Sequence, residues 1–122
     1  MNGNTTACHI HAPTAVALTG TAGVATTTPF FAGFPIGVTA GLYNNTLDLT
    51  LSTSYNPSYI TANGGTTATA SAALLAAIAA GRSYFNVHTT VVPGGEIRGF
   101  LQQFDPTATA KSTWSRVKSL YH

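Results

Sequence analysis

Polar and apolar residues alternate with a period of two in four segments of this chain, and such alternation predicts β-strands. The segments are residues 7–12, 47–51, 83–89 and 96–104. In the second of them, Leu47, Leu49 and Leu51 would all face a core. A Pro-Gly-Gly turn in residues 90–95 separates the last two segments, so we expect these to form an antiparallel hairpin.

A helical pattern replaces the alternation in residues 71–80, which are almost all Ala, Leu and Ile. Thr69 or Ser71 can cap the start of this helix, and Gly81 can supply the left-handed residue after its end. The buried stripe of the helix is expected to consist of Leu74, Leu75 and Ile78.

Loops and turns are predicted for much of the remaining chain. Residues 14–41 are rich in Gly, Pro and Thr, so we expect loops there with one or two short edge strands. Residues 55–59 contain an Asn-Pro pair and residues 63–65 an Asn-Gly-Gly run, and both are expected to be turns.

The pattern changes after Asp105-Pro106. Trp114, Val117 and Tyr121 follow i, i+3, i+7 spacing, which predicts a short amphipathic helix. The sequence thus divides into a domain in residues 1–105 and a C-terminal tail, with this helix, in residues 106–122.

Composition places the domain among folded, weakly charged proteins. Hydrophobic residues make up 44% of the chain and charged residues 7%, with a formal net charge of +2. Thr, Ser, Asn and Gly supply most polar positions, which suits an extracellular or cell-surface β-protein. Three of the five Lys and Arg residues lie in the last twelve positions, so the domain body offers no basic surface for nucleic acid.

No segment reaches the roughly 18 apolar residues of a membrane span. The first four residues are polar and carry no signal-peptide pattern, so a secreted form would be a mature chain or a fragment. Cys8 is the only cysteine, which excludes an internal disulfide. We expect it to be a small buried hydrophobic residue, the alternatives being a ligand or an interchain disulfide.

Three of the four histidines are placed where they could share a metal ion. His9 and His11 occupy alternate positions of one predicted strand, so both imidazoles lie on one face, with Cα atoms about 6.5–7 Å apart. His88, in another predicted strand, is the candidate third ligand. Three imidazoles without an acidic cluster favour copper or zinc over calcium or magnesium, and copper is our first choice for an oxidising compartment. The alternative is a purely structural polar cluster.

Glu96 and Arg98 share one face of the last predicted strand. One interpretation is an ion pair or a hydrogen-bond network that ties the hairpin to its neighbours. The other makes Glu96 a fourth metal ligand, or an acceptor that orients His88 from outside the coordination sphere. Glu96 therefore joins the three histidines as a candidate metal-site residue.

Three motifs of this chain together resemble the CHRD (chordin-type) domain family. They are Cys8-His9-Ile10-His11-Ala12-Pro13, Tyr84-Phe85-Asn86-Val87-His88-Thr89 and Pro93-Gly94-Gly95-Glu96-Ile97-Arg98-Gly99. With the Ala-rich helix in its place between them, the resemblance spans about residues 7–104. It implies an all-β fold, an antiparallel Greek-key-like β-sandwich, and implies little about activity.

The chain departs from the family pattern at its start. Family domains usually have several strands before the His-Ile-His motif, whereas six residues precede position 7 here. Either the domain is cut short, or the missing strands come from another chain or from a preceding segment removed by processing. Ala12 also stands where the family usually has glycine.

Three functions follow from these expectations. The first is an extracellular metal-binding module, for copper storage, delivery or redox chemistry. The second is a structural or adhesive module of a matrix or filament, in which other protein chains complete the sandwich. The third is a copper-dependent oxidative enzyme, although the sequence shows no general acid–base pair or nucleophile motif.

Overall fold

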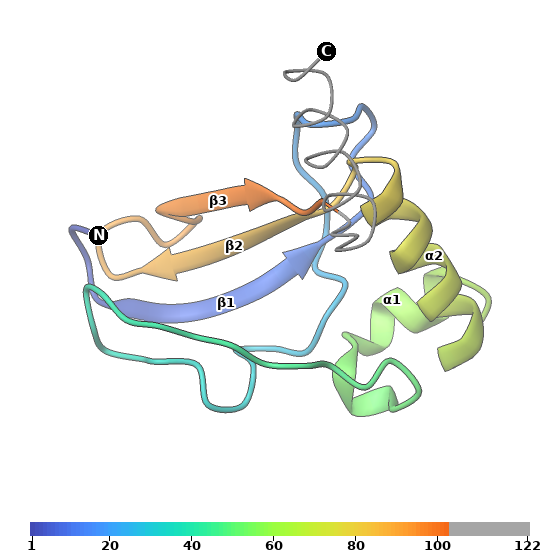
Figure 1. Cartoon of the computed structure of the whole chain (residues 1–122), viewed down its shortest axis with the longest axis horizontal. Coiled ribbons are helices and arrows are strands. Elements are labelled where there is room, and N and C mark those ends of the chain that lie inside the picture. Colours follow the sequence, from blue (N-terminus) through green and yellow to red (C-terminus); the bar gives the residue numbers. More distant parts are fainter. Residues whose placement is uncertain (103–122) are drawn as a thin grey trace, which may run out of the picture.

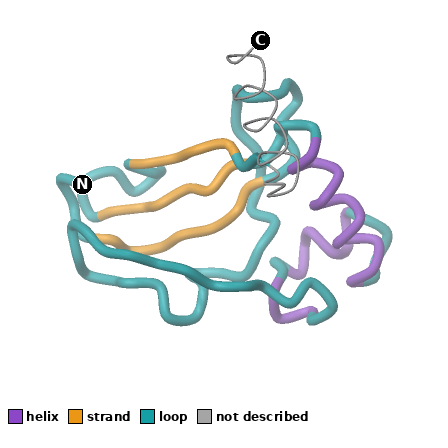
Figure 2. The backbone as a smooth tube through the Cα atoms, in the orientation of Figure 1, coloured by secondary structure: helices purple, strands orange, loops and turns teal. Residues whose placement is uncertain are grey.

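The computed structural model of the chain describes residues 1–102, and its framework is one antiparallel three-stranded sheet. In pairing order, the strands are β1 (Thr5–His11), β2 (Tyr84–Thr89) and β3 (Ile97–Phe100). Figure 1 shows the strands side by side, with helices α1 (Pro57–Ala62) and α2 (Thr67–Ala79) beyond one end of the sheet. Loops form much of the rest, as Figure 2 shows, and they include one 3-10 turn, η1 (Ser52–Ser54).

The register between β1 and β2 decides which side chains share a face of the sheet. His9 pairs with Asn86, and Ala7 pairs with His88. Directly paired residues project to the same face, as do alternate residues of one strand. His9, His11 and His88 therefore lie on one face, and both predicted strands are confirmed.

The predicted hairpin of β2 and β3 is confirmed, but β3 is shorter than the predicted strand 96–104. Tyr84, the first residue of β2, pairs with Phe100, the last residue of β3. One further hydrogen bond joins the Leu101 backbone N–H to the Ser83 carbonyl oxygen at 2.9 Å.

Helix α2 begins earlier than predicted because Thr66 caps it, instead of Thr69 or Ser71. The Thr66 hydroxyl accepts a hydrogen bond from the Thr69 backbone N–H at 3.1 Å, and the Thr69 hydroxyl accepts one from the Thr66 backbone N–H at 3.3 Å. This capping box satisfies two backbone donors at the helix start. Gly81 has a φ of +68°, which confirms the left-handed residue predicted after the helix.

The buried face of α2 differs in part from the predicted stripe. Leu74 is 1% exposed and packs in the core with Ala70 and Ala77. Ile78 is partly buried against the same core, whereas Leu75 is 53% exposed. Ala70, Leu74 and Ala77 follow i, i+4, i+7 spacing and define the buried face, and Leu75 lies on the other side of that face from Ala73, toward solvent.

Helix α1 replaces the turn predicted for residues 55–59. The Asn56 side chain accepts a hydrogen bond from the Ser58 backbone N–H at 3.4 Å, and Pro57 takes the first helical position. Proline is tolerated there because a backbone N–H at that position would have no helical partner. The Asn-Pro pair therefore starts a helix, which places Tyr59 in the core.

The strand predicted for residues 47–51 is wrong, because Asp48 organises a local turn. Its carboxylate accepts hydrogen bonds from the Thr50 backbone N–H at 2.9 Å and from the Thr50 hydroxyl at 2.6 Å. Short polar side chains commonly stabilise turns in this way. Leu49 packs against the core, but Leu51 is 51% exposed.

Residues 14–41 contain no strand of the sheet, although they cover the outer edge of β1. The Cys8 backbone N–H donates to the Pro29 carbonyl at 3.1 Å, and the Thr5 backbone N–H donates to the Val38 carbonyl at 2.9 Å. Loop carbonyls thus satisfy donors that a neighbouring strand would otherwise bind. Cys8 itself is fully buried, as expected.

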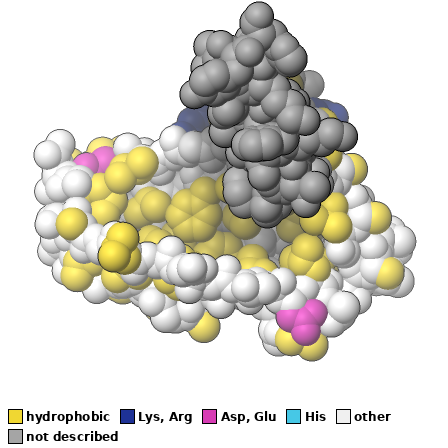
Figure 3. Space-filling view, in the orientation of Figure 1, with side chains coloured by type: hydrophobic (Ala, Val, Ile, Leu, Met, Phe, Trp, Pro, Cys, Tyr) yellow, Lys and Arg dark blue, Asp and Glu magenta, His cyan; other side chains and the backbone are white. Residues whose placement is uncertain are grey.

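Within residues 1–102 there is one sheet, so the second sheet of the predicted β-sandwich and its Greek-key order are not found there. The face opposite the histidines is covered by loop aromatics instead, with the Phe31 and Phe85 ring centroids 5.9 Å apart. A hollow of about 260 Å³ remains beside them, lined also by Ile10, Tyr43 and Leu47. Figure 3 shows hydrophobic side chains gathered over the strands in this view.

The helix predicted in the C-terminal tail lies outside the described residues. That helix and the domain boundary at residue 105 therefore stay predictions. Among residues 1–102, no helix has the length and apolar character needed to cross a membrane.

Candidate metal centre

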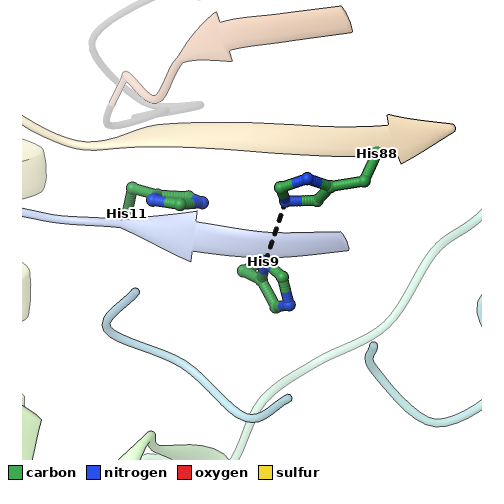
Figure 4. Close-up of side chains that lie close together, drawn as sticks. All are labelled: His9, His11 and His88. Carbon is green, nitrogen blue, oxygen red and sulfur yellow. Dashed lines mark hydrogen bonds between the residues drawn. The ribbon is translucent and has the colours of Figure 1, made fainter. Parts of the chain in front are cut away.

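Three histidine side chains converge on the polar face of the sheet. His9 and His11 come from β1 and His88 comes from β2, and Figure 4 shows their rings gathered over the two strands. One ring nitrogen from each lies within 4.8 Å of the other two, so the group could hold a metal ion. His9 is 7% exposed and His11 is 8% exposed. The structure therefore brings together all three histidines that the sequence selected.

Backbone carbonyls fix the proton position on two of these rings. His11 Nδ1 lies 2.8 Å from the Ala22 carbonyl oxygen, and His88 Nδ1 lies 2.7 Å from the Pro93 carbonyl oxygen. A carbonyl can only accept, so Nδ1 carries the proton in each neutral ring and Nε2 carries a lone pair. His11 Nε2 is buried with no hydrogen-bond partner in the described structure. Both rings thus present an unprotonated nitrogen, which is the form that binds a metal.

The third ring, that of His9, forms a hydrogen bond with one of the other two. His9 Nδ1 lies 3.1 Å from His88 Nε2, the nitrogen that carries a lone pair (dashed line in Figure 4). Because that lone pair can only accept, a neutral His9 ring donates its Nδ1 proton to His88.

Burial favours the uncharged form of two of these rings, those of His9 and His11. Burial, and next the neighbouring His88 and His11 rings, lower the pKa of His9 to about 4. Burial also lowers the pKa of His11, against the opposing effect of the Ala22 carbonyl. Protonation of these two rings therefore needs acid, and their coordinating lone pairs stay available near neutrality.

An aromatic stack supports the His11 ring from the side. The Tyr84 ring lies 4.8 Å from it, centroid to centroid, with an interplanar angle of 7°. The Tyr84 hydroxyl accepts a hydrogen bond from the Ala22 backbone N–H at 3.2 Å, next to the carbonyl that holds His11 Nδ1. Arg98 lies over the Tyr84 ring at 4.9 Å and donates to the Gly20 carbonyl at 2.9 Å. The family motif residue Tyr84 thus orients a candidate ligand, a role that spacing along one strand does not reveal.

Glu96 is not part of the histidine group. Its carboxylate accepts hydrogen bonds from the Asn2 and Gly3 backbone N–H groups and from the Thr89 hydroxyl, the last two at 3.0 Å and 2.6 Å. The Thr89 bond, followed by the Asn2 bond, lowers the pKa of Glu96. Of the two interpretations of Glu96, the geometry favours the hydrogen-bond network, which fastens the start of the chain to the β2–β3 hairpin.

The fold and site together describe a small domain with an antiparallel sheet and a three-histidine group on one face. The family model for the CHRD domain matches residues 2–101, so the chain belongs to the CHRD domain family. Such domains are typically extracellular and generally mediate protein interactions. Neither the curated proteins nor the solved structures contain a significant match to this chain.

Proposed function

We propose that this chain is an extracellular CHRD module that binds one transition-metal ion, with copper favoured, through His9, His11 and His88. The observation that carries the proposal is the set of three converging nitrogens, two of which have their protons fixed on the outer side by carbonyls. Outer carbonyl partners of this kind are usual for metal-binding histidines. A purely structural cluster would not need to bury His11 Nε2 without a partner.

The donor set supports copper or zinc. Imidazole nitrogen suits both metals, whereas calcium and magnesium require oxygen ligands, and the group contains no carboxylate. Three protein ligands also leave a coordination position for water or another small ligand. Copper is favoured because it binds nitrogen sites more tightly than zinc in the Irving–Williams order, and because the family is typically extracellular.

Metal titration of the purified, metal-free chain tests the proposal. We expect one Cu(II) or Zn(II) ion per wild-type chain, and an affinity at least about 100-fold lower in the His9→Ala/His88→Ala double variant, since one ligand is left. His122→Ala is the matched control, because it removes the chain's fourth histidine and leaves the group intact. Equal, weak binding by the wild type and the double variant contradicts the proposal.

An assembly role is the second candidate, favoured by the apolar hollow over Ile10, Phe31 and Phe85. The residues that line it are all uncharged, so a similarly uncharged surface fits it, and a second copy of this chain offers one. Strands from that copy would complete the β-sandwich that the resemblance to the CHRD family implies. Mass measurement in solution decides this point: a dimer or larger assembly supports it, and a stable folded monomer at high concentration contradicts it.

A further inference from the structure

The turn that carries Pro93 is held from inside by the Asn86 side chain. Asn86 lies on β2 two residues before His88 and is 5% exposed. Its Nδ2 donates a hydrogen bond to the Gly94 carbonyl at 3.2 Å. Gly94 directly follows Pro93, whose carbonyl accepts the proton of His88 Nδ1 at 2.7 Å. One side-chain amide therefore anchors the peptide segment that fixes the proton on a candidate ligand.

The contact between Asn86 and the turn depends on glycine at position 95. A Cβ atom at Gly95 would lie 2.1 Å from Asn86 Oδ1, far inside any normal contact distance. Gly95 also has a φ of +121°, a conformation that other residues rarely adopt. The second glycine of the Pro-Gly-Gly motif thus lets the turn close directly onto the Asn86 amide.

The outer side of the same turn is held independently. The Thr89 hydroxyl accepts a hydrogen bond from the Val92 backbone N–H at 3.1 Å and donates one to Glu96 at 2.6 Å. The Thr90 backbone N–H donates to the Asn4 carbonyl at 2.9 Å. Because these contacts do not involve Asn86, its replacement should leave the hairpin folded and shift mainly the Pro93–Gly94 segment.

The polar side chain at position 86 lowers the stability of the fold, so folding alone does not explain its presence. Asn86 Oδ1 is buried and has no hydrogen-bond partner in the described structure. A buried acceptor without a partner typically destabilises a protein by about 1–3 kcal/mol. An apolar residue at this position would avoid that cost, so the bond from Nδ2 to Gly94 is the chemical use of the amide.

We infer that Asn86 is a positioning residue of the metal site, which holds the Pro93 carbonyl where it keeps the proton on His88 Nδ1 and the lone pair on His88 Nε2. This inference rests on the proposed function, because a fixed tautomer of His88 is useful to the protein only if His88 binds a metal ion. The tautomer that Asn86 selects is nevertheless a property of the metal-free protein. Histidines bound to a metal depend on such outer contacts for roughly 10- to 100-fold in affinity.

Asn86→Leu tests the inference, because leucine has similar size and cannot donate to Gly94. In metal-free wild type, long-range ¹H–¹⁵N NMR spectra should show His88 and His11 both protonated on Nδ1. In the variant, His88 should become a mixture of tautomers while His11 stays protonated on Nδ1. The affinity for Cu(II) or Zn(II) should fall by roughly 10- to 100-fold. Asn63→Leu is the matched control, since it removes an equivalent bond from Asn63 Nδ2 to the Tyr59 carbonyl at the end of α1.

The outcomes separate this inference from the proposed function. An unchanged His88 tautomer in Asn86→Leu overturns the inference, whether or not the wild type binds metal. Absence of metal binding by the wild type overturns the proposed function, while the tautomer comparison still decides the role of Asn86. Asn86→Ser serves the same test if the leucine variant does not fold, because serine is smaller and too short to reach Gly94.

Discussion

Acid should destabilise the metal-free protein through His9. Burial and the neighbouring imidazoles lower the pKa of His9 from 6.5 to about 4 in the folded state. The unfolded chain therefore binds this proton more readily than the folded chain does. The free energy of unfolding has its full value above about pH 6.5, and the contribution of His9 is lost progressively as the pH falls from there through the folded pKa. At about 1.4 kcal/mol per pKa unit, the full effect is about 3.5 kcal/mol.

The useful range for this measurement ends near pH 5, because the carboxylates begin to take up protons below it. Between about pH 7.5 and about pH 5, His9 alone should lower the free energy of unfolding by about 2 kcal/mol. Urea denaturation with a chelator present measures this free energy at each pH.

A His9→Gln variant isolates the contribution of His9. Its stability should depend less on pH than that of the wild type, and the difference between the two slopes is the predicted quantity. His11, whose pKa is also lowered by burial, contributes in the same direction in both proteins and does not account for the difference. Identical pH dependence in wild type and variant would refute the argument that burial keeps His9 neutral.

Two further predictions concern the core and the start of the chain. Leu74→Ala should lower the free energy of unfolding by about 3 kcal/mol, while Leu75→Ala at the exposed neighbouring position should cost less than about 1 kcal/mol; similar losses in urea denaturation would contradict the assignment of the buried face. Glu96→Gln should speed amide hydrogen exchange at Asn2 and Gly3 several-fold and leave the metal affinity unchanged. A large loss of metal affinity would show instead that Glu96 is a metal ligand.

Much of the candidate site was predictable from the sequence because strand geometry is local. Alternation along β1 puts His9 and His11 on one face whatever the rest of the chain does. The hairpin signal of Pro-Gly-Gly between two strands was equally local, and it was confirmed. The helix around Leu74 was also recognised from composition, since a run of Ala and Leu favours a helix in most contexts.

Two errors of the sequence analysis arose at polar side chains that can stabilise either of two local structures. Asn56 was assigned to a turn and Asp48 to a strand, yet Asn56 caps α1 and Asp48 stabilises a turn. Asn, Asp, Ser and Thr side chains can bond nearby backbone groups in several conformations of similar energy. Packing against the core decides among these conformations, and a short sequence window does not contain that information.

The sequence by itself determined the family, the paired strands and the three histidines that can share an ion. Only the tertiary structure decided what surrounds them. The Ala22 and Pro93 carbonyls that set the proton positions lie in loops, and Glu96 binds backbone groups 93 and 94 residues away. Such contacts depend on strand register and loop closure, which the whole chain sets together, whereas the alternation of side chains along a strand depends on backbone geometry alone.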